Sequence, residues 1–122
     1  MKRIDFSHDW NRAGDSPSGK LGLKCFTTIR RAGDYHRVGE QYEVWLRDTP
    51  LFIAQIVYIK HFFLADLNEA MARLDTGYGV EDCKKIMHKM WGKYGDVDST
   101  LFAFIVLERL ETDNQTTEEI EV

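Results

Sequence analysis

The chain has 122 residues, of which 43% are hydrophobic and 30% charged, with a net charge of −4. This length fits one domain with its own hydrophobic core. No apolar run approaches the ~18 residues of a membrane-spanning helix, and the N-terminal MKRIDFSHDW has no apolar stretch typical of a signal peptide. We therefore expect a cytoplasmic protein with no membrane contact.

Acidic charge is concentrated at the C-terminus. Residues 111–122 carry five acidic side chains and no basic one, and the rest of the chain has 16 basic and 15 acidic side chains. The segment is also rich in Thr, Asn and Gln. We therefore expect one domain over residues 1–110, followed by a disordered acidic tail over residues 111–122.

The first half of the chain predicts strands separated by turns. Residues 2–6 predict a short strand, and residues 11–22, with three glycines, predict a loop. Residues 24–31 are rich in β-formers, and residues 41–48 alternate as a half-buried strand does. Asp48, Thr49 and Pro50 predict a turn, and residues 51–59 a nearly fully buried strand.

The second half predicts two helices and a last strand. Asp66, with Glu69 three residues later, resembles a helix N-cap, and residues 75–79 end this first helix. A last strand is expected over residues 101–110. The apolar stripe of the first helix consists of Leu67, Ala70, Met71 and Leu74. One face of the second helix carries Val80, Cys83, Met87, Met90, Trp91 and Tyr94, of which we assign Met87, Met90 and Trp91 to the core.

Strands and helices do not alternate in this order, which indicates the α+β class. We expect a small β-barrel of about five to six strands, with two main helices covering one side. The four histidines show no ligand spacing, and the two cysteines have no CxxC partner. No phosphate-binding or dinucleotide motif occurs. The sequence therefore predicts no metal site and no cofactor.

The segment from Lys20 to Arg37 is basic, with five basic side chains and Asp34 as its one acid. On a strand alternate residues share a face, so we expect Lys24, Thr28 and Arg30 to project to one side. A cation, a hydroxyl and a guanidinium on one surface can bind a phosphate or the carbonyl of a base. A solvated strand edge is the alternative.

The same residues carry a family resemblance. Gly22-Leu23-Lys24-Cys25-Phe26-Thr27-Thr28-Ile29-Arg30 resembles the G-x-K-x-x-T-x-R signature of ASCH domains, which are β-barrel modules of the PUA-like superfamily. The similarity continues over roughly residues 20–110. It implies a PUA-like barrel that binds RNA, a nucleotide or a modified nucleoside in a cleft beside the barrel.

Two alignments of the signature are open. Alignment on Thr28, Ile29 and Arg30 puts Cys25 at the lysine position, whereas alignment on Gly22 and Lys24 makes Thr27 the threonine. A β-bulge would reconcile them, because one extra residue redirects a side chain. Lys20 is a second lysine that can reach the same site.

Some ASCH proteins remove the acetyl group from N4-acetylcytidine, and the resemblance implies roles for particular residues. Lys24 would activate the threonine, Thr28 would attack, and Asp75 would transfer protons. Ligand contacts would come from two cations, Lys20 and Arg30, and from two stacking aromatics, Tyr78 and Trp10.

Three hypotheses about function follow. The first is a binding module for RNA or a modified nucleoside, and the second is a small amidohydrolase acting on acylated cytidine. The third is a protein-interaction module of a phage or mobile element that uses the acidic tail as its contact.

Overall fold

A computed structural model describes residues 1–9 and 19–110 of the chain. Trp10 and the expected tail over residues 111–122 lie outside the described residues. Five strands, two α-helices and four short 3₁₀ helices follow in the order β1 (Arg3–Phe6), η1 (Lys20–Gly22), β2 (Cys25–Arg31), β3 (Gln41–Leu46), β4 (Thr49–Phe62), η2 (Leu64–Asp66), α1 (Glu69–Thr76), α2 (Val80–Trp91), η3 (Gly92–Tyr94), η4 (Val97–Ser99) and β5 (Phe102–Arg109).

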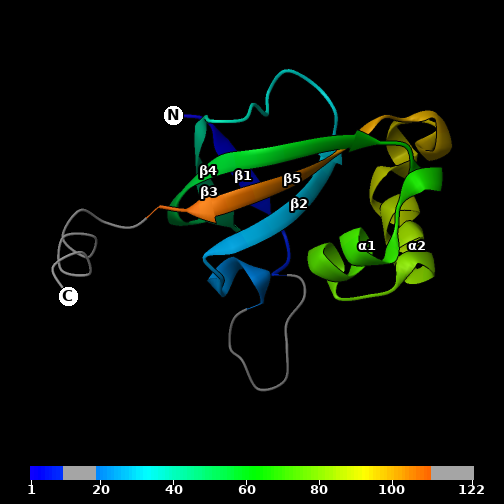
Figure 1. The fold of residues 1–122 in the computed structure, drawn as a ribbon, viewed down its shortest axis with the longest axis horizontal. Coiled ribbons are helices and arrows are strands. Elements are labelled where there is room, and N and C mark those ends of the chain that lie inside the picture. Colours follow the sequence, from blue (N-terminus) through cyan, green and yellow to red (C-terminus); the bar gives the residue numbers. More distant parts are fainter. Residues whose placement is uncertain (10–18, 111–122) are drawn as a thin grey trace, which may run out of the picture.

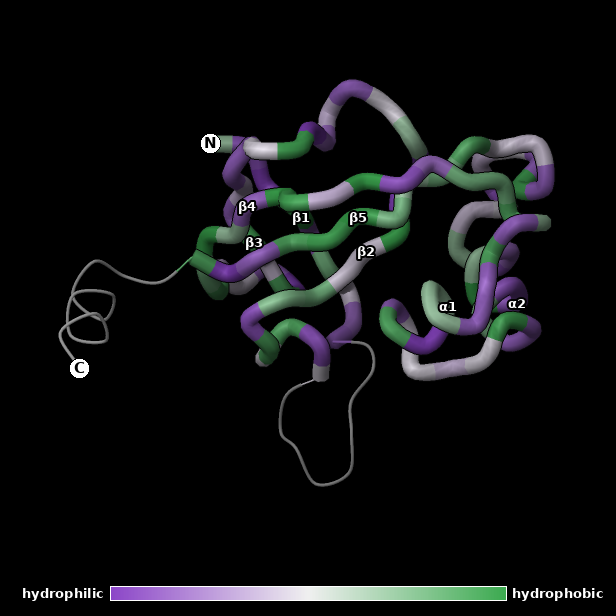
Figure 2. Tube along the Cα trace, viewed as in Figure 1, coloured by the Kyte–Doolittle hydropathy of each residue, from purple (hydrophilic) through white to green (hydrophobic). Residues whose placement is uncertain are grey.

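The strands form one curled sheet, in the order β1-β3-β4-β5-β2, which has the shape of a half-barrel (Figure 1). All neighbours are antiparallel except β1 and β3, which run parallel. Apolar residues run along most of β5 and are interrupted by polar ones along the central strand β4 (Figure 2). Side chains on the concave face make the first core cluster, which includes Ile4, Tyr42, Ile56, Ile105 and Leu107.

Side chains close the seam between the two edge strands, β1 and β2. The rings of Phe6 and Phe26 meet edge to face with centroids 6.2 Å apart. Arg30 Nη2 on β2 donates to the carbonyl oxygen of Asp5 on β1 at 2.7 Å. The curl of the sheet therefore brings its two edge strands, β1 and β2, into contact.

The two helices lie together at one end of the sheet (Figure 1). They enclose a second core cluster in which Met71, Ala72, Cys83 and Met87 meet the apolar ends of β2 and β5, Ile29, Phe102 and Phe104. The predicted α+β architecture, with two helices beside a small curled sheet, is thus confirmed. Within the described ranges, no helix is long and apolar enough to cross a membrane.

The hairpin between β3 and β4 differs from the predicted turn at Asp48-Thr49-Pro50. Leu46 pairs with Thr49, so the loop consists of Arg47 and Asp48, whose φ angles are 44° and 68°. Two positive φ angles in a two-residue loop define a type I′ turn, whose twist matches that of the strands it joins. Pro50 lies within β4, close to its start, at the irregularity where the register shifts between Val44 and Trp45.

The prediction that residues 51–59 are nearly fully buried was wrong. Ala54 and Ile56 are fully buried, whereas Leu51, Ile53, Val57 and Tyr58 are 38–51% exposed. An antiparallel strand in a sheet with one covered face exposes its other face. Apolar residues with high β-propensity therefore occupy both faces of β4, although only one of these faces is buried.

The buried face of α1 also differs from the predicted stripe. Met71 is buried as expected, but Leu74 is 55% exposed and Ala70 is exposed too. The helix instead turns Ala72, Asp75 and Thr76 inward. Its N-cap is Asn68, whose side chain accepts from the backbone N–H of Met71 at 2.8 Å, in place of the predicted Asp66. Burial of Asp75 requires a partner for its charge, and that partner is described below.

His36 lies half-buried in an aromatic group beside the seam. Its ring meets Tyr35 edge to face at 5.0 Å and lies 6.0 Å from the ring of Tyr42. Burial, together with the positive charges of Arg30 and Lys2, lowers the pKa of His36 from 6.5 to about 4. The folded protein therefore holds this imidazole neutral.

This lowered pKa predicts a component of stability that depends on pH. Between pH 6.5 and about 4 the unfolded chain binds a proton at His36 that the folded chain does not, so the free energy of unfolding falls as the pH is lowered through this window. Urea denaturation of the wild type and of a His36→Gln variant at several pH values measures the difference. We expect the two profiles to converge toward low pH; profiles that stay parallel from pH 7 to 4 would contradict the assignment.

Candidate functional site

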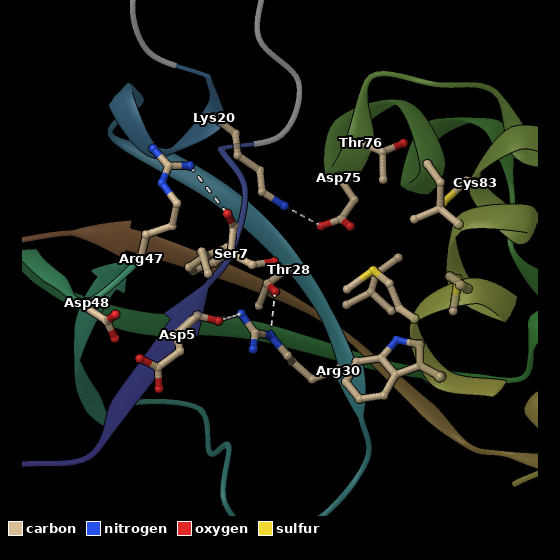
Figure 3. Close-up of a pocket in the computed structure, with 16 residues that line it drawn as sticks. Asp5, Ser7, Lys20, Thr28, Arg30, Arg47, Asp48, Asp75, Thr76 and Cys83 are labelled. Atoms are coloured by element: carbon tan, nitrogen blue, oxygen red, sulfur yellow. Dashed lines mark hydrogen bonds and ion pairs between the residues drawn. The ribbon is translucent and has the colours of Figure 1, made fainter. Parts of the chain in front are cut away.

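A cavity of about 470 Å³ lies between the seam of the sheet and the helices (Figure 3). Its walls come from β1, η1, β2, the β3–β4 turn, α1 and α2. The lining residues are Asp5, Phe6, Ser7, Lys20, Thr28, Ile29, Arg30, Arg47, Asp48, Asp75, Thr76, Cys83, Ile86, Met87, Met90 and Trp91.

A buried ion pair forms one wall of this cavity. Lys20 Nζ donates to Asp75 Oδ1 at 2.8 Å, and the two residues are 2% and 7% exposed. Thr27 Oγ1 donates to the same carboxylate oxygen at 3.0 Å. Three elements, η1, β2 and α1, are therefore joined at one oxygen atom.

Burial has a direct effect on the lysine. Desolvation lowers the pKa of Lys20 below its ordinary value, because burial disfavours the charged form; Asp75 acts in the opposite direction. Arg30 adds to the lowering through its own positive charge. Lys20 is thus closer to the neutral amine than a surface lysine is.

Arg30 and Thr28 form a second polar group in the cavity. Arg30 Nε donates to Thr28 Oγ1 at 2.8 Å, while its Nη2 atom is held by the Asp5 carbonyl oxygen. Its guanidinium lies 4.8 Å from the centroid of the Phe6 ring. Because Thr28 accepts from a cation, its own O–H proton is left to donate, and the positive charge favours negative charge on the hydroxyl oxygen.

The remaining walls differ in polarity. Asp5, Ser7, Arg47 and Asp48 line the side formed by β1 and the β3–β4 turn, opposite the helices (Figure 3). Arg47 Nη1 donates to the Ser7 carbonyl oxygen at 3.4 Å, which ties the turn to β1. The side formed by α2 is mostly apolar, with Cys83, Ile86, Met87, Met90 and Trp91. The cavity is therefore amphipathic.

Four of the predicted site residues meet in this cavity: Lys20, Thr28, Arg30 and Asp75. Lys24 does not join them, because it is exposed and lies before the start of β2. Although Lys24 and Thr28 have the same parity along the strand, four residues of strand span ~13 Å. Between them Phe26 points into the sheet's core and contacts Phe52. Lys24 therefore lies outside the cavity that Thr28 and Arg30 line.

Of the two predicted stacking aromatics, Tyr78 does not line the cavity. Tyr78 is 50% exposed in the turn between α1 and α2 and is not among the lining residues. Trp10 lies outside the described residues. The aromatic side chain of α2 in the wall is Trp91, which the helical stripe assigned to the core.

Other residues of the site were missed from the sequence. Thr27 was named only as an alternative to Thr28, and it is the one bonded to Asp75. Asp5, Arg47 and Asp48 carry no motif, and only the curl of the sheet brings them to the cavity. In the described part of the chain, no group of three His, Cys, Asp or Glu side chains is placed to hold a metal ion.

Comparisons with known proteins concern the fold. No protein-family model and no curated protein sequence matches the chain. The chain is similar to the crystal structure of protein EF3133 from Enterococcus faecalis V583, of the family DUF984, with a TM-score of 0.58 and 12% identity over 75% of this chain and 67% of that one. At 12% identity this likeness concerns the fold alone.

The ion pair predicts a large effect of removing one partner. Lys20→Met leaves the Asp75 carboxylate buried without its counter-charge, so we expect a loss of about 3–5 kcal/mol in the free energy of unfolding. The double variant Lys20→Met/Asp75→Leu removes both charges, and we expect it to recover most of this loss. Chemical denaturation of both single variants and the double variant gives the coupling energy.

Lys24→Met is the matched control, because Lys24 is an exposed lysine four residues from Lys20. Its effect should stay within about 0.5 kcal/mol of zero. Equal losses for Lys20→Met and Lys24→Met, or a double variant that loses the sum of both single losses, would contradict a tightly coupled buried pair.

Proposed function

We propose that this protein binds a neutral nucleoside, modified on its base, in the cavity between the sheet and the helices. The observation that carries the proposal is the charge balance of an amphipathic cavity of nucleoside size. Its volume of about 470 Å³ falls within the ~300–1,000 Å³ of small-molecule sites. One wall is apolar and the others offer several hydrogen-bonding groups.

The charges of the wall favour a neutral ligand. Three basic side chains (Lys20, Arg30 and Arg47) and three acidic ones (Asp5, Asp48 and Asp75) line the cavity, and the Asp5 carboxylate also pairs with Arg3. The charge of Lys20 is matched by Asp75. Two N–H groups of Arg30 are already bound, one by the Thr28 hydroxyl and one by the Asp5 carbonyl oxygen. A site for a polyanion would leave excess positive charge facing the ligand.

The arrangement of polar and apolar groups suits the two halves of a nucleoside. Met87, Met90 and Trp91 supply an apolar and aromatic surface for a base. Thr28 has an O–H group to donate to a base carbonyl. Asp5 and Asp48, on the other side, are acceptors for sugar hydroxyls. ASCH-type proteins, which this sequence resembles, provide the analogy for the ligand class.

Calorimetric titration with cytidine, N4-acetylcytidine and cytidine 5′-monophosphate tests the proposal. We expect nucleoside affinity to change little between 50 and 300 mM salt, since few counterions are released. Thr28→Val removes one hydrogen bond and should weaken binding about 5- to 10-fold. Thr49→Val, at an exposed strand position outside the cavity lining, is the matched control.

Two results would overturn the proposal. One is measurable binding of cytidine 5′-monophosphate with no measurable binding of cytidine or N4-acetylcytidine. The other is nucleoside binding that Thr28→Val and Thr49→Val leave equally unchanged.

A second candidate function is hydrolysis of an amide on the base, and the buried Lys20–Asp75–Thr27 group beside Thr28 favours it. The Thr28 oxygen would attack the acyl carbon while its proton passes to the Lys20 amine, which must first pass its own proton to Asp75; burial, which lowers the Lys20 pKa, favours that neutral amine. The C–N bond then breaks, and the amine leaves with a proton. Water hydrolyses the acyl-threonine to release a carboxylic acid and restore the hydroxyl.

Incubation with N4-acetylcytidine, followed by chromatography, tests this reaction. We expect release of cytidine and acetate, a loss of about 10²–10⁴-fold in rate for Thr28→Val, and partial retention for Thr28→Ser, which keeps the hydroxyl. Lys24→Gln is the control and should keep full activity. If Thr27→Val loses turnover while Thr28→Val retains it, the nucleophile is Thr27 instead of Thr28. If the wild type shows no turnover, N4-acetylcytidine is excluded as a substrate, and the binding proposal still has its own test.

A further inference from the structure

An aromatic and basic surface adjoins the cavity at Trp91. It consists of Arg31, the last residue of β2, with Trp91, Lys93 and Tyr94, and we call it the ledge. Trp91 lines the cavity, and its ring lies 6.1 Å from that of Tyr94. Tyr94, in η3, is 58% exposed. The ledge therefore continues one wall of the cavity onto the protein surface.

Two cations are held against these rings. Arg31 Cζ lies 5.7 Å from the ring centroid of Trp91 and 5.1 Å from that of Tyr94, and Lys93 Nζ lies 5.1 Å from Tyr94. Neither cation forms an ion pair with a carboxylate of residues 1–9 or 19–110. Their charge is therefore available to an anion, unlike that of Lys20 inside the cavity.

The contrast between the cavity and the ledge indicates what each can hold. The cavity contains charges of both signs, whereas the ledge combines the exposed ring of Tyr94 and the half-buried ring of Trp91 with two cations that have no ion pair within residues 1–9 and 19–110. Rings with neighbouring cations are the surfaces on which single-stranded nucleic acids stack their bases and place their phosphates. Trp91 lines the cavity and also contacts Arg31 and Tyr94 of the ledge, so the two surfaces are continuous at this side chain.

We propose that the ledge binds the nucleotides next to the nucleoside in the cavity, so that the partner is a single-stranded RNA with one nucleoside inserted. This inference rests on the proposed function, which places a nucleoside in the cavity. A base stacks on Tyr94 and Trp91, and the flanking phosphates contact Arg31 and Lys93. Asp5 and Asp48 in the cavity wall can accept from the ribose 2′-hydroxyl, which is the group that distinguishes RNA from DNA.

Fluorescence anisotropy with a labelled pentacytidylate RNA, beside calorimetry with cytidine, tests the inference on the full chain. We expect the RNA to bind at least tenfold tighter than cytidine at low salt. Tyr94→Ala should weaken RNA binding about 5- to 100-fold and leave cytidine binding unchanged. Arg31→Gln should lower the salt dependence of RNA binding by about one phosphate contact. Tyr58→Ala is the matched control, because Tyr58 is an exposed tyrosine (51%) on β4 outside the ledge.

The outcomes separate this inference from the proposed function. Cytidine binding with no gain for the RNA, or equal RNA affinity in Tyr94→Ala and Tyr58→Ala, overturns the ledge and leaves the nucleoside proposal standing. Failure of both ligands to bind overturns both. A pentadeoxycytidylate that binds as tightly as the RNA overturns the assignment of RNA as the partner.

Discussion

The ion pair between Lys20 and Asp75 is the constraint on which the rest of this structure depends. Two opposite charges that are almost fully buried stabilise a fold only if their geometry is satisfied, because each has lost its hydration. Here the carboxylate oxygen also accepts from Thr27. The short helix η1, the edge strand β2 and the helix α1 are thereby held at fixed positions relative to one another. The cavity is the space that this arrangement leaves between the sheet and α2.

The same pair explains features of the fold that hydrophobic packing alone would not give. Helix α1 exposes Leu74 and buries Asp75, because the carboxylate must reach Lys20. The edge strands β1 and β2 meet through Arg30, which also orients Thr28 in the cavity. Polar groups thus set the positions of the elements around the site, while apolar groups fill the two clusters on either side. This division leaves a cavity whose walls are partly apolar and partly polar.

The sequence predicted the order of the strands and helices well, but it predicted poorly which residues would contact one another. Alternation along residues 41–46 and the β-rich segment 25–31 are local signals, and both strands were predicted. The choice between Lys20 and Lys24 was not a local matter, because it depends on Asp75, 55 residues from Lys20 along the chain. For the same reason the stripe of α1 was assigned one position away from the true buried face. Met90 and Trp91 read as core from their spacing, since a cavity wall and a core present the same apolar pattern.

The turn between β3 and β4 has a consequence for how this protein tolerates change. Arg47 and Asp48 both adopt left-handed backbone conformations, which a type I′ turn normally gives to Asn and Gly. Keeping these two charged side chains beside the cavity therefore costs conformational free energy, because Asn and Gly adopt the left-handed conformation more easily than Arg and Asp do. Such positions are where stability and function are in conflict. A chain selected for thermal tolerance alone would drift toward Asn-Gly here and lose that side of its cavity while its fold improved.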